Sequence, residues 1–348
     1  MRIALLNLPI DNNYGGNLQR YALIKVLQDM GHDVEHVQLK STDKHSWTIP
    51  FRILKRTFVR IFNHNQEIFI ERNRKKKIAE ILPFYNQYIP HSSEEYDENN
   101  IHELCHYDAY IVGSDQVWRK KISKNNLPLL FLNFISDRNI VKLAYSVSFG
   151  CDVNELNKSE INLLGELYSR FTAVSVREFS GIDLIKSYGW ELPKPIQLLD
   201  PTFLLSIDNY KCIIDNNRTS KSKGELFCYL LDPSSEKYDK VRQISSSKGF
   251  VPFFCTLNDR ISIEQWLKSF YDAKYVITDS YHGMVFSIIF NKPFYLFRNE
   301  KRGNSRFDTL FNLFKIKDTE NIDWKIVNGV IAYKRSCSIA FLSSNLYL

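Results

Sequence analysis

One histidine occupies a setting that could support chemistry. His282 is the only histidine after His106, and it ends the polar stretch 279–282, which directly follows the apolar run 275–278. Residues at the carboxyl end of a strand in an open α/β sheet meet ligands, and an imidazole gains or loses a proton near neutral pH. His282 is therefore a candidate catalytic residue. The alternative is a loop histidine whose hydrogen bonds are satisfied within the protein.

Other polar residues follow apolar runs in the same way. Four further runs stop at glycine or charged residues: 108–112 before Gly113 and Asp115, 141–149 before Gly150, 173–176 before Arg177, and 196–199 before Asp200. In a doubly wound sheet such endings line one edge. We expect these residues to lie near one another. A salt bridge with Glu178 is the alternative for Arg177, and capping of a following helix is the alternative for Asp115.

A glycine pair near the amino terminus could also meet a ligand. Residues Tyr14-Gly15-Gly16-Asn17 lie between a strand-like run, 2–8, and the helical apolar spacing of 17–30. Glycine lets the backbone approach a ligand closely, and a helix amino terminus attracts anions. The alternative is a tight turn. The pattern is neither GxGxxG nor a P-loop, so it does not indicate a nucleotide site.

The elements that would position these residues form two α/β series. In the first, the strand and helix above lead into a strand at 33–39, followed by the four runs already described. A polar stretch, 216–224, separates it from the second series. That series contains strands at 225–231, 250–256, 274–278 and 292–297 and helices at 234–248, 263–272, 283–290 and 307–314. We expect an α/β protein with two Rossmann-like domains, residues 1–215 and 216–348, facing across a cleft that holds the ligand.

Size and composition limit the class of protein. The chain has 348 residues, a net charge of +7 and a pI near 8.9. It has no apolar run of about 18 residues or more and no signal peptide pattern, so we expect a cytoplasmic protein. The six cysteines form no CxxC pair, and no metal-ligand cluster appears, so no metal is expected. The positive charge suits anionic partners. A glycan- or nucleic-acid-binding module would also fit this charge, but no nucleic-acid motif supports the latter.

Residues 51–77 form a basic amphipathic segment. Nine lysines and arginines there alternate with isoleucine, leucine and phenylalanine. We favour a helix whose apolar face packs on the domain and whose basic face is solvated. The alternative is contact with a membrane surface or an anionic lipid headgroup.

Six short blocks, taken in order, resemble the polysaccharide pyruvyltransferase family. They are Asn13-Tyr-Gly-Gly-Asn-Leu-Gln19, Gly113-Ser-Asp-Gln-Val-Trp118, Ala144-Tyr-Ser-Val-Ser-Phe-Gly150, Val174-Ser-Val-Arg-Glu-Phe-Ser180, Leu199-Asp-Pro-Thr-Phe203 and Asp279-Ser-Tyr-His-Gly283. Each block is weak alone, and the order makes the signal specific. The resemblance covers roughly residues 2–314.

The resemblance implies a GT-B-like fold with an acceptor side in the first domain and a donor site around His282 in the second. It implies transfer of a pyruvyl group from phosphoenolpyruvate to two hydroxyls of a sugar, in a cell-surface polysaccharide or its lipid-linked precursor. It further implies that Arg177 and His282 bind the donor or catalyse. A carboxylate would deprotonate the attacking hydroxyl, and Asp115 is our leading candidate, ahead of Asp279 and Asp200. No cofactor is implied beyond the donor substrate.

The remaining residues of these blocks are expected to contact substrate: Tyr14, Gly15, Gly16, Asn17, Gln19, Ser114, Trp118, Asp279 and Ser280. One departure stands out, because many family members have Arg-Leu-His where this chain has Ser280-Tyr281-His282. If that arginine contacts the donor in those members, its role here must pass to another basic residue, or donor affinity is lower. The alternative function is a GT-B glycosyltransferase that uses a nucleotide-sugar donor. Either enzyme is expected in the cytoplasm and, if the basic segment 51–77 contacts a membrane, at its inner face.

Overall fold

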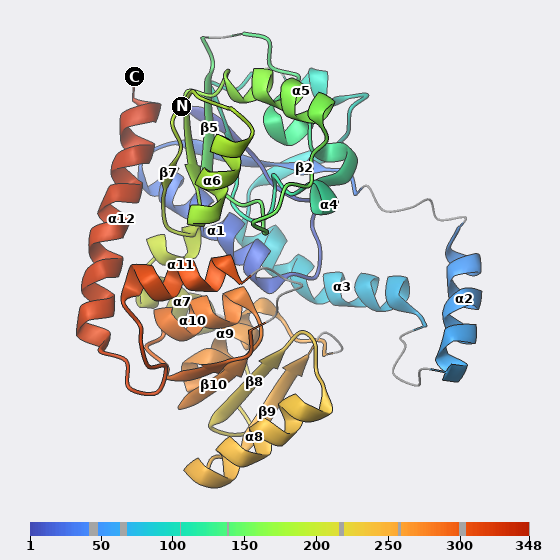
Figure 1. Ribbon diagram of the computed structural model, residues 1–348, viewed down its shortest axis with the longest axis vertical. Helices are drawn as coiled ribbons and strands as arrows, with labels where there is room; N and C mark the ends of the chain where they lie inside the picture. The colour runs from blue at the N-terminus through green and yellow to red at the C-terminus, as the bar shows by residue number, and fades with distance from the viewer. Residues whose placement is uncertain are drawn as a thin grey trace.

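The computed structural model describes residues 1–41, 48–62, 68–104, 106–137, 139–215, 219–256, 259–298 and 304–347. It has two layered α/β units, the first drawn above the second in Figure 1. The upper unit holds a seven-stranded sheet in the order β3-β2-β1-β4-β5-β6-β7. Its strands, all paired in parallel, are β1 (Arg2–Leu6), β2 (Asp33–Leu39), β3 (His91–Tyr96), β4 (Ala109–Val112), β5 (Val141–Val147), β6 (Ala173–Val176) and β7 (Ile196–Gln197).

The lower unit holds a four-stranded parallel sheet in the order β11-β10-β8-β9. Its strands are β8 (Leu226–Leu230), β9 (Pro252–Thr256), β10 (Tyr275–Thr278) and β11 (Phe294–Leu296). Strands β4 and β10 are buried along their whole length. Helices cover both faces of such a strand, which explains why both read as continuous apolar runs.

Helices connect these strands. They are α1 (Tyr14–Asp29), α2 (Ile49–Phe62), α3 (Ile70–Tyr88), α4 (Lys120–Ser123), α5 (Lys158–Tyr168), α6 (Phe179–Ser187), α7 (Ile207–Asp215), α8 (Ser235–Lys248), α9 (Ile263–Asp272), α10 (Tyr281–Ile289), α11 (Ser305–Phe314) and α12 (Trp324–Leu346). The predicted class, α/β with two Rossmann-like units, is confirmed.

Several elements were not predicted from the sequence, among them β3, α5, α6, α7 and α12. Strand β3 is mostly polar and only Ser92 within it is buried, because it forms the edge of the sheet. Helix α12 follows the second α/β series but returns to the first unit, where Arg335 donates hydrogen bonds to the carbonyls of Phe203 and Leu205, each at 2.9 Å. Figure 1 shows α12 running beside both units.

The two units share one apolar core. A single cluster of buried side chains extends from Leu5 in β1 through α1 to Phe227 in β8 and Met284 in α10. Between the units, the rings of Tyr14 and Trp266 stack with centroids 5.4 Å apart. The division into residues 1–215 and 216–348 as separate domains stays a prediction, and residues 216–218 of the proposed linker lie outside the described residues.

Helices α2 and α3 depart from the favoured interpretation of the basic segment. The second half of α3 packs on the body through Ile81, Phe84 and Tyr85, whereas α2 projects away from it (Figure 1). The apolar face of α2 does not pack on the body: Phe51, Leu54 and Phe58 are 69%, 71% and 64% exposed. The expected packing is therefore wrong for α2, and residues 63–67 lie outside the described chain. Within the described residues, no helix has the length and apolar character needed to span a bilayer.

Candidate active site

A cleft of about 430 Å³ lies where the two sheets direct their carboxyl ends toward each other. The first unit contributes residues that follow β1 and β4, and the second contributes residues that follow β8 and β10. The lining residues are Leu8, Asp11, Asn12, Asn13, Asp115, Gln116, Arg119, Ile122, Tyr229, Leu231, Asp279, Ser280, Tyr281, His282 and Arg306. The predicted cleft between two Rossmann-like units is therefore present, as expected for ligand sites in open α/β sheets.

His282 lies at the floor of this cleft. It belongs to the first turn of α10 rather than to a loop, because the helix begins at Tyr281 with Ser280 as its N-cap residue. Its side chain is nearly buried, and Nε2 lies 3.6 Å from Oδ2 of Asp200 in the first unit. The imidazole thus bridges the two units at a helix amino terminus, where an anion is favoured.

The glycine pair of the first unit supports His282. Residues 14–17 form the first turn of α1, not a loop before it, and Asn13 caps the helix by accepting a hydrogen bond from Gly16 N. Gly15 is packed so tightly against His282 that a Cβ at this position would lie 2.0 Å from ring atoms Cγ and Nδ1. Glycine at position 15 is therefore needed for the imidazole to occupy its place.

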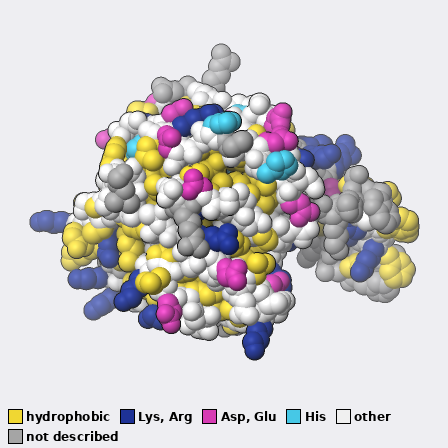
Figure 2. Space-filling model, turned by 90° about the horizontal axis from the view of Figure 1, so that it is seen from above, with side chains coloured by type: hydrophobic (Ala, Val, Ile, Leu, Met, Phe, Trp, Pro, Cys, Tyr) yellow, Lys and Arg dark blue, Asp and Glu magenta, His cyan; other side chains and the backbone are white. Residues whose placement is uncertain are grey.

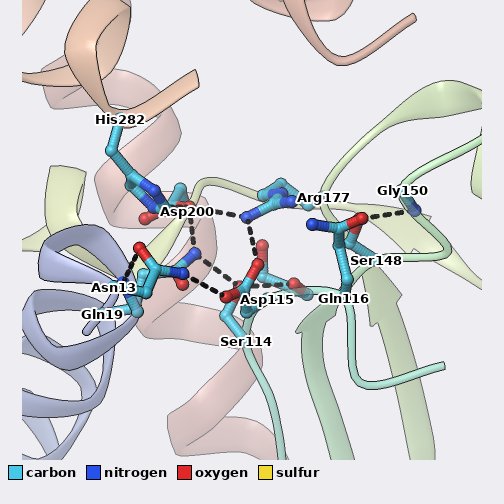
Figure 3. Close-up of polar contacts among 12 residues, drawn as sticks. Asn13, Gln19, Ser114, Asp115, Gln116, Ser148, Gly150, Arg177, Asp200 and His282 are labelled. Carbon is cyan, nitrogen blue, oxygen red and sulfur yellow. Dashed lines mark hydrogen bonds and ion pairs between the residues drawn. The ribbon is translucent and has the colours of Figure 1, made fainter. Parts of the chain in front are cut away.

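Asp200 connects most of the predicted residues. Its carboxylate accepts hydrogen bonds from Gln19 and from Thr202, and Arg177 Nη1 lies 3.3 Å from Oδ2 (Figure 3). Burial acts to raise the pKa of Asp200, but His282, Arg177 and the Thr202 hydrogen bond outweigh it and hold this pKa well below its usual value. Asp200 is thus an ionised carboxylate between the imidazole and the guanidinium.

Arg177 lies behind the cleft and not in its wall. Its side chain is 1% exposed and contacts three carboxylates: Glu178 at 3.3 Å, Asp200 at 3.3 Å and Asp115 at 3.7 Å. Burial acts against the charged form, but the neighbouring carboxylates and Tyr281 raise the pKa of Arg177 above its usual value. The salt bridge to Glu178 that we considered as the alternative is present. In this structure Arg177 holds the acids of the site in place.

Asp115 faces the cleft. Its Oδ2 accepts a hydrogen bond of 3.2 Å from Asn13 Nδ2, and its backbone is left-handed, with φ of 69°. Aspartate tolerates that conformation better than most residues. The backbone of Asp115 also bridges to β5, where its carbonyl accepts a hydrogen bond from Ser148 N. A fixed backbone therefore presents this carboxylate to the space beside His282 (Figure 3).

The other predicted residues divide into wall and support. Asp279 and Ser280 line the cleft, although the Asp279 carboxylate is held by the backbone N–H groups of Leu231 and Asp232 and by Lys237. The remaining predicted residues are buried behind the wall, where they pack or form hydrogen bonds within the protein: Tyr14, Gly16, Asn17, Gln19 and Ser114.

Trp118 requires a correction. We expected a contact with substrate, but the indole is 1% exposed, stacks on Phe131 with centroids 4.5 Å apart and donates a hydrogen bond to the carbonyl of Leu130. A ring enclosed in this way supports the loop after β4 and does not face the cleft.

Two arginines of the wall were missed by sequence reasoning. Arg119 holds Glu155 and Gln116, and Arg306 at the start of α11 lies with its Cζ 5.4 Å from the centre of the Tyr281 ring. Arg177 approaches the same ring at 4.4 Å. Burial and the nearby Arg177 lower the pKa of Arg306 to about 10. The absence of arginine at position 280 was the only signal that another basic residue was needed here.

The site contains carboxylates, arginines and one imidazole. Among the described residues, no group of three or more His, Cys, Asp or Glu side chains is arranged to hold a metal ion. Instead, carboxylates alternate with arginines and one imidazole around the cleft. Such an arrangement can bind an anion, donate a proton and accept one.

Replacing Asp200 by asparagine is expected to lower the free energy of unfolding at pH 7 by about 3 kcal/mol, because a buried charge pair loses one partner. The depressed pKa of Asp200 means that its contribution is complete above the unfolded pKa of about 3.9 and is lost as pH falls through the folded pKa. The difference between the two proteins should therefore shrink in urea titrations below pH 4. The exposed Asp239, replaced in the same way, serves as the control. Equal stability of Asp200→Asn and the parent at pH 7 would contradict the assignment.

Residues 13–301 match the model of the polysaccharide pyruvyl transferase family. No curated protein matches the chain.

Several solved structures are similar at low sequence identity. UDP-N-acetylglucosamine 2-epimerase from Rickettsia bellii is 9% identical over 100% of this chain and 99% of its own, with a TM-score of 0.49. HepE from Anabaena, in complex with UDP and glucose, is 10% identical over 99% and 100% of the two chains, with a TM-score of 0.48. UDP-GlcNAc 2-epimerase from Methanocaldococcus jannaschii is 11% identical over 96% of this chain and 94% of its own, with a TM-score of 0.47.

Proposed function

The chain belongs to the polysaccharide pyruvyl transferase family, and on that premise we propose that it transfers a pyruvyl group from phosphoenolpyruvate to two hydroxyls of one sugar. The product is a cyclic ketal on a cell-surface polysaccharide or its lipid-linked precursor. The observation that carries the proposal is that His282, Asp115 and Arg306 line one cleft, with the buried Asp200 behind His282 at 3.6 Å.

The charges of the cleft suit the donor. Phosphoenolpyruvate carries its carboxylate and its phosphate on the same carbon, and a guanidinium binds either group in a planar fork. Arg306 and Arg119 line the cleft, and the amino terminus of α10 adds backbone donors beside His282. Arg306 also lies with its Cζ 5.4 Å from the centre of the ring of Tyr281, the residue after Ser280, and position 280 is where many family members have an arginine. We propose that Arg306 takes over that role.

The residues also suit the reaction. A proton is added to the methylene carbon of the donor, which becomes a methyl group and leaves an oxocarbenium-like centre next to it. The first sugar hydroxyl attacks that centre and loses its proton. The bond to phosphate then breaks, and the second hydroxyl closes the ketal ring as inorganic phosphate departs. Two protons are therefore taken from the hydroxyls, one proton is delivered to carbon, and the remaining one leaves on the inorganic phosphate, which departs by cleavage of its bond to the donor carbon.

We assign these proton transfers to two groups. His282 is the candidate acid, or else the ligand of the departing phosphate, and Asp200 orients its ring and offers a counter-charge. Asp115 is the candidate base for the attacking hydroxyl, because its carboxylate faces the same cleft. Arg177 acts as a positioning residue, since it contacts both Asp115 and Asp200 without reaching the cleft.

Donor binding distinguishes the proposal from a glycosyltransferase with a nucleotide-sugar donor. At one hundred times its Kd, a ligand stabilises a protein by about 2.7 kcal/mol, which raises Tm by several degrees. We expect phosphoenolpyruvate to raise Tm and UDP to leave it unchanged. Stabilisation by UDP alone would overturn the pyruvyl transfer proposal in favour of the glycosyltransferase.

A matched pair of variants tests the site of binding. Arg306→Gln should abolish most of the rise in Tm, because it removes a guanidinium from the wall of the cleft. Arg298→Gln, in a surface ion pair with Asp308, should preserve it. Mass spectrometry of candidate glycans incubated with phosphoenolpyruvate then reports the product, a glycan that has gained a pyruvyl unit with loss of water.

A further inference from the structure

Helix α2 presents an apolar face to solvent. Phe51, Leu54 and Phe58 recur at the spacing of one helix face, and each is more than three-fifths exposed. Figure 2 shows hydrophobic and basic side chains together on the projecting part of the molecule. Monomeric proteins rarely leave three large apolar side chains contiguous on one exposed helix face without a partner.

The polar side of α2 fixes this orientation. Glu71 at the start of α3 accepts two hydrogen bonds from Arg56, at 2.7 and 2.9 Å, and lies 3.2 Å from Arg52. Two basic residues of α2, Arg52 and Arg56, are therefore tied to the neighbouring helix. The apolar side is consequently directed away from the protein, which reverses the usual arrangement of a helix on a globular surface.

The charge of the chain is concentrated in the same segment. Residues 51–77 contain nine Lys and Arg and two Asp and Glu, a net charge of +7. The whole chain has 46 and 39, also a net charge of +7, so the other residues contain 37 of each sign and are neutral. The positive potential of the protein therefore arises from the segment that bears the exposed apolar face.

We propose that α2 and the start of α3 form a docking surface for an anionic lipid bilayer. The apolar face of α2 would enter the headgroup region, and lysines and arginines of 51–77 would contact lipid phosphates. A second copy of the chain is a poorer partner for this surface, because pairing would bring two segments of +7 together. The surface does not depend on the reaction catalysed in the cleft.

Vesicle sedimentation of the full-length protein tests this surface. We expect binding to vesicles of phosphatidylcholine and phosphatidylglycerol, and weak or no binding to phosphatidylcholine alone. The triple variant Phe51→Ser, Leu54→Ser, Phe58→Ser should reduce binding by more than ten-fold, because it removes the three apolar side chains that would be buried in the bilayer. Lys55→Gln and Lys75→Gln should each reduce it roughly five-fold, and only on anionic vesicles.

Two control variants distinguish this surface from nonspecific hydrophobic binding to vesicles. Val153→Ser and Leu163→Ser remove exposed apolar side chains elsewhere on the molecule and should leave binding unchanged. Circular dichroism and Tm of all variants report that the fold persists. Equal binding by the triple variant, or no binding to anionic vesicles, would overturn the proposal. A dimer in solution that the triple variant dissociates would assign the face to self-association instead.

Discussion

Replacement of His282 by alanine is expected to lower kcat by roughly 10²–10⁴-fold while the protein stays folded. The imidazole lies where the two units meet, 3.6 Å from the Asp200 carboxylate and in the wall of the cleft. Among the described side chains of that wall, it alone is an imidazole, the group that most often serves as a general acid in enzymes. Phosphate release and mass spectrometry of the glycan measure the loss.

Two further variants sharpen this test. His102→Ala removes an exposed histidine far from the cleft and should leave the rate unchanged. His282→Gln keeps a hydrogen-bond donor but cannot transfer a proton. If it restores KM and not kcat, His282 is the acid; if it restores both, His282 is a phosphate ligand. Full activity of His282→Ala would remove His282 from the mechanism.

The positions of the strand ends were predictable because parallel sheets obey a simple rule. Every run expected to stop at a polar residue does so at the carboxyl edge, and this brings Asp115, Arg177, Asp200 and His282 together. The sequence could not show which of these carboxylates contacts the imidazole. Asp200 precedes a proline and has the pattern of a turn residue, yet it is the carboxylate that touches both the guanidinium and the imidazole. Ranking required distances between segments far apart in the chain.

The position of Arg306 and the orientation of α2 depend on tertiary contacts, which local sequence patterns do not show. Arg306 reaches the cleft from α11, well outside the motif blocks, through its contact with Tyr281. The periodicity of α2 indicated which side was apolar, but not which side faced the protein. That orientation is set by Glu71, fifteen residues after Arg56, whose carboxylate pairs with two of the three arginines of α2, Arg52 and Arg56.

Gly15→Ala is expected to lower kcat by at least roughly 100-fold, although it adds only one methyl group. A Cβ at position 15 would lie 2.0 Å from two atoms of the His282 ring, so the ring must move or the two units must separate. Displacement of a reacting group by about 1 Å can cost 10²-fold in rate. The same assays of phosphate release and pyruvylated glycan measure this loss.

Gly329→Ala is the matched control, because Gly329 is also helical and a Cβ there meets nothing within 4 Å. Helix propensity favours alanine over glycine by up to about 1 kcal/mol, so Gly329→Ala should be neutral or stabilising. In the His282→Ala background the overlap at position 15 disappears, and Gly15→Ala should then cost no further stability or rate. This non-additivity identifies the steric contact itself. Additive losses in the double variant would show that Gly15 acts on the site by some route other than the imidazole.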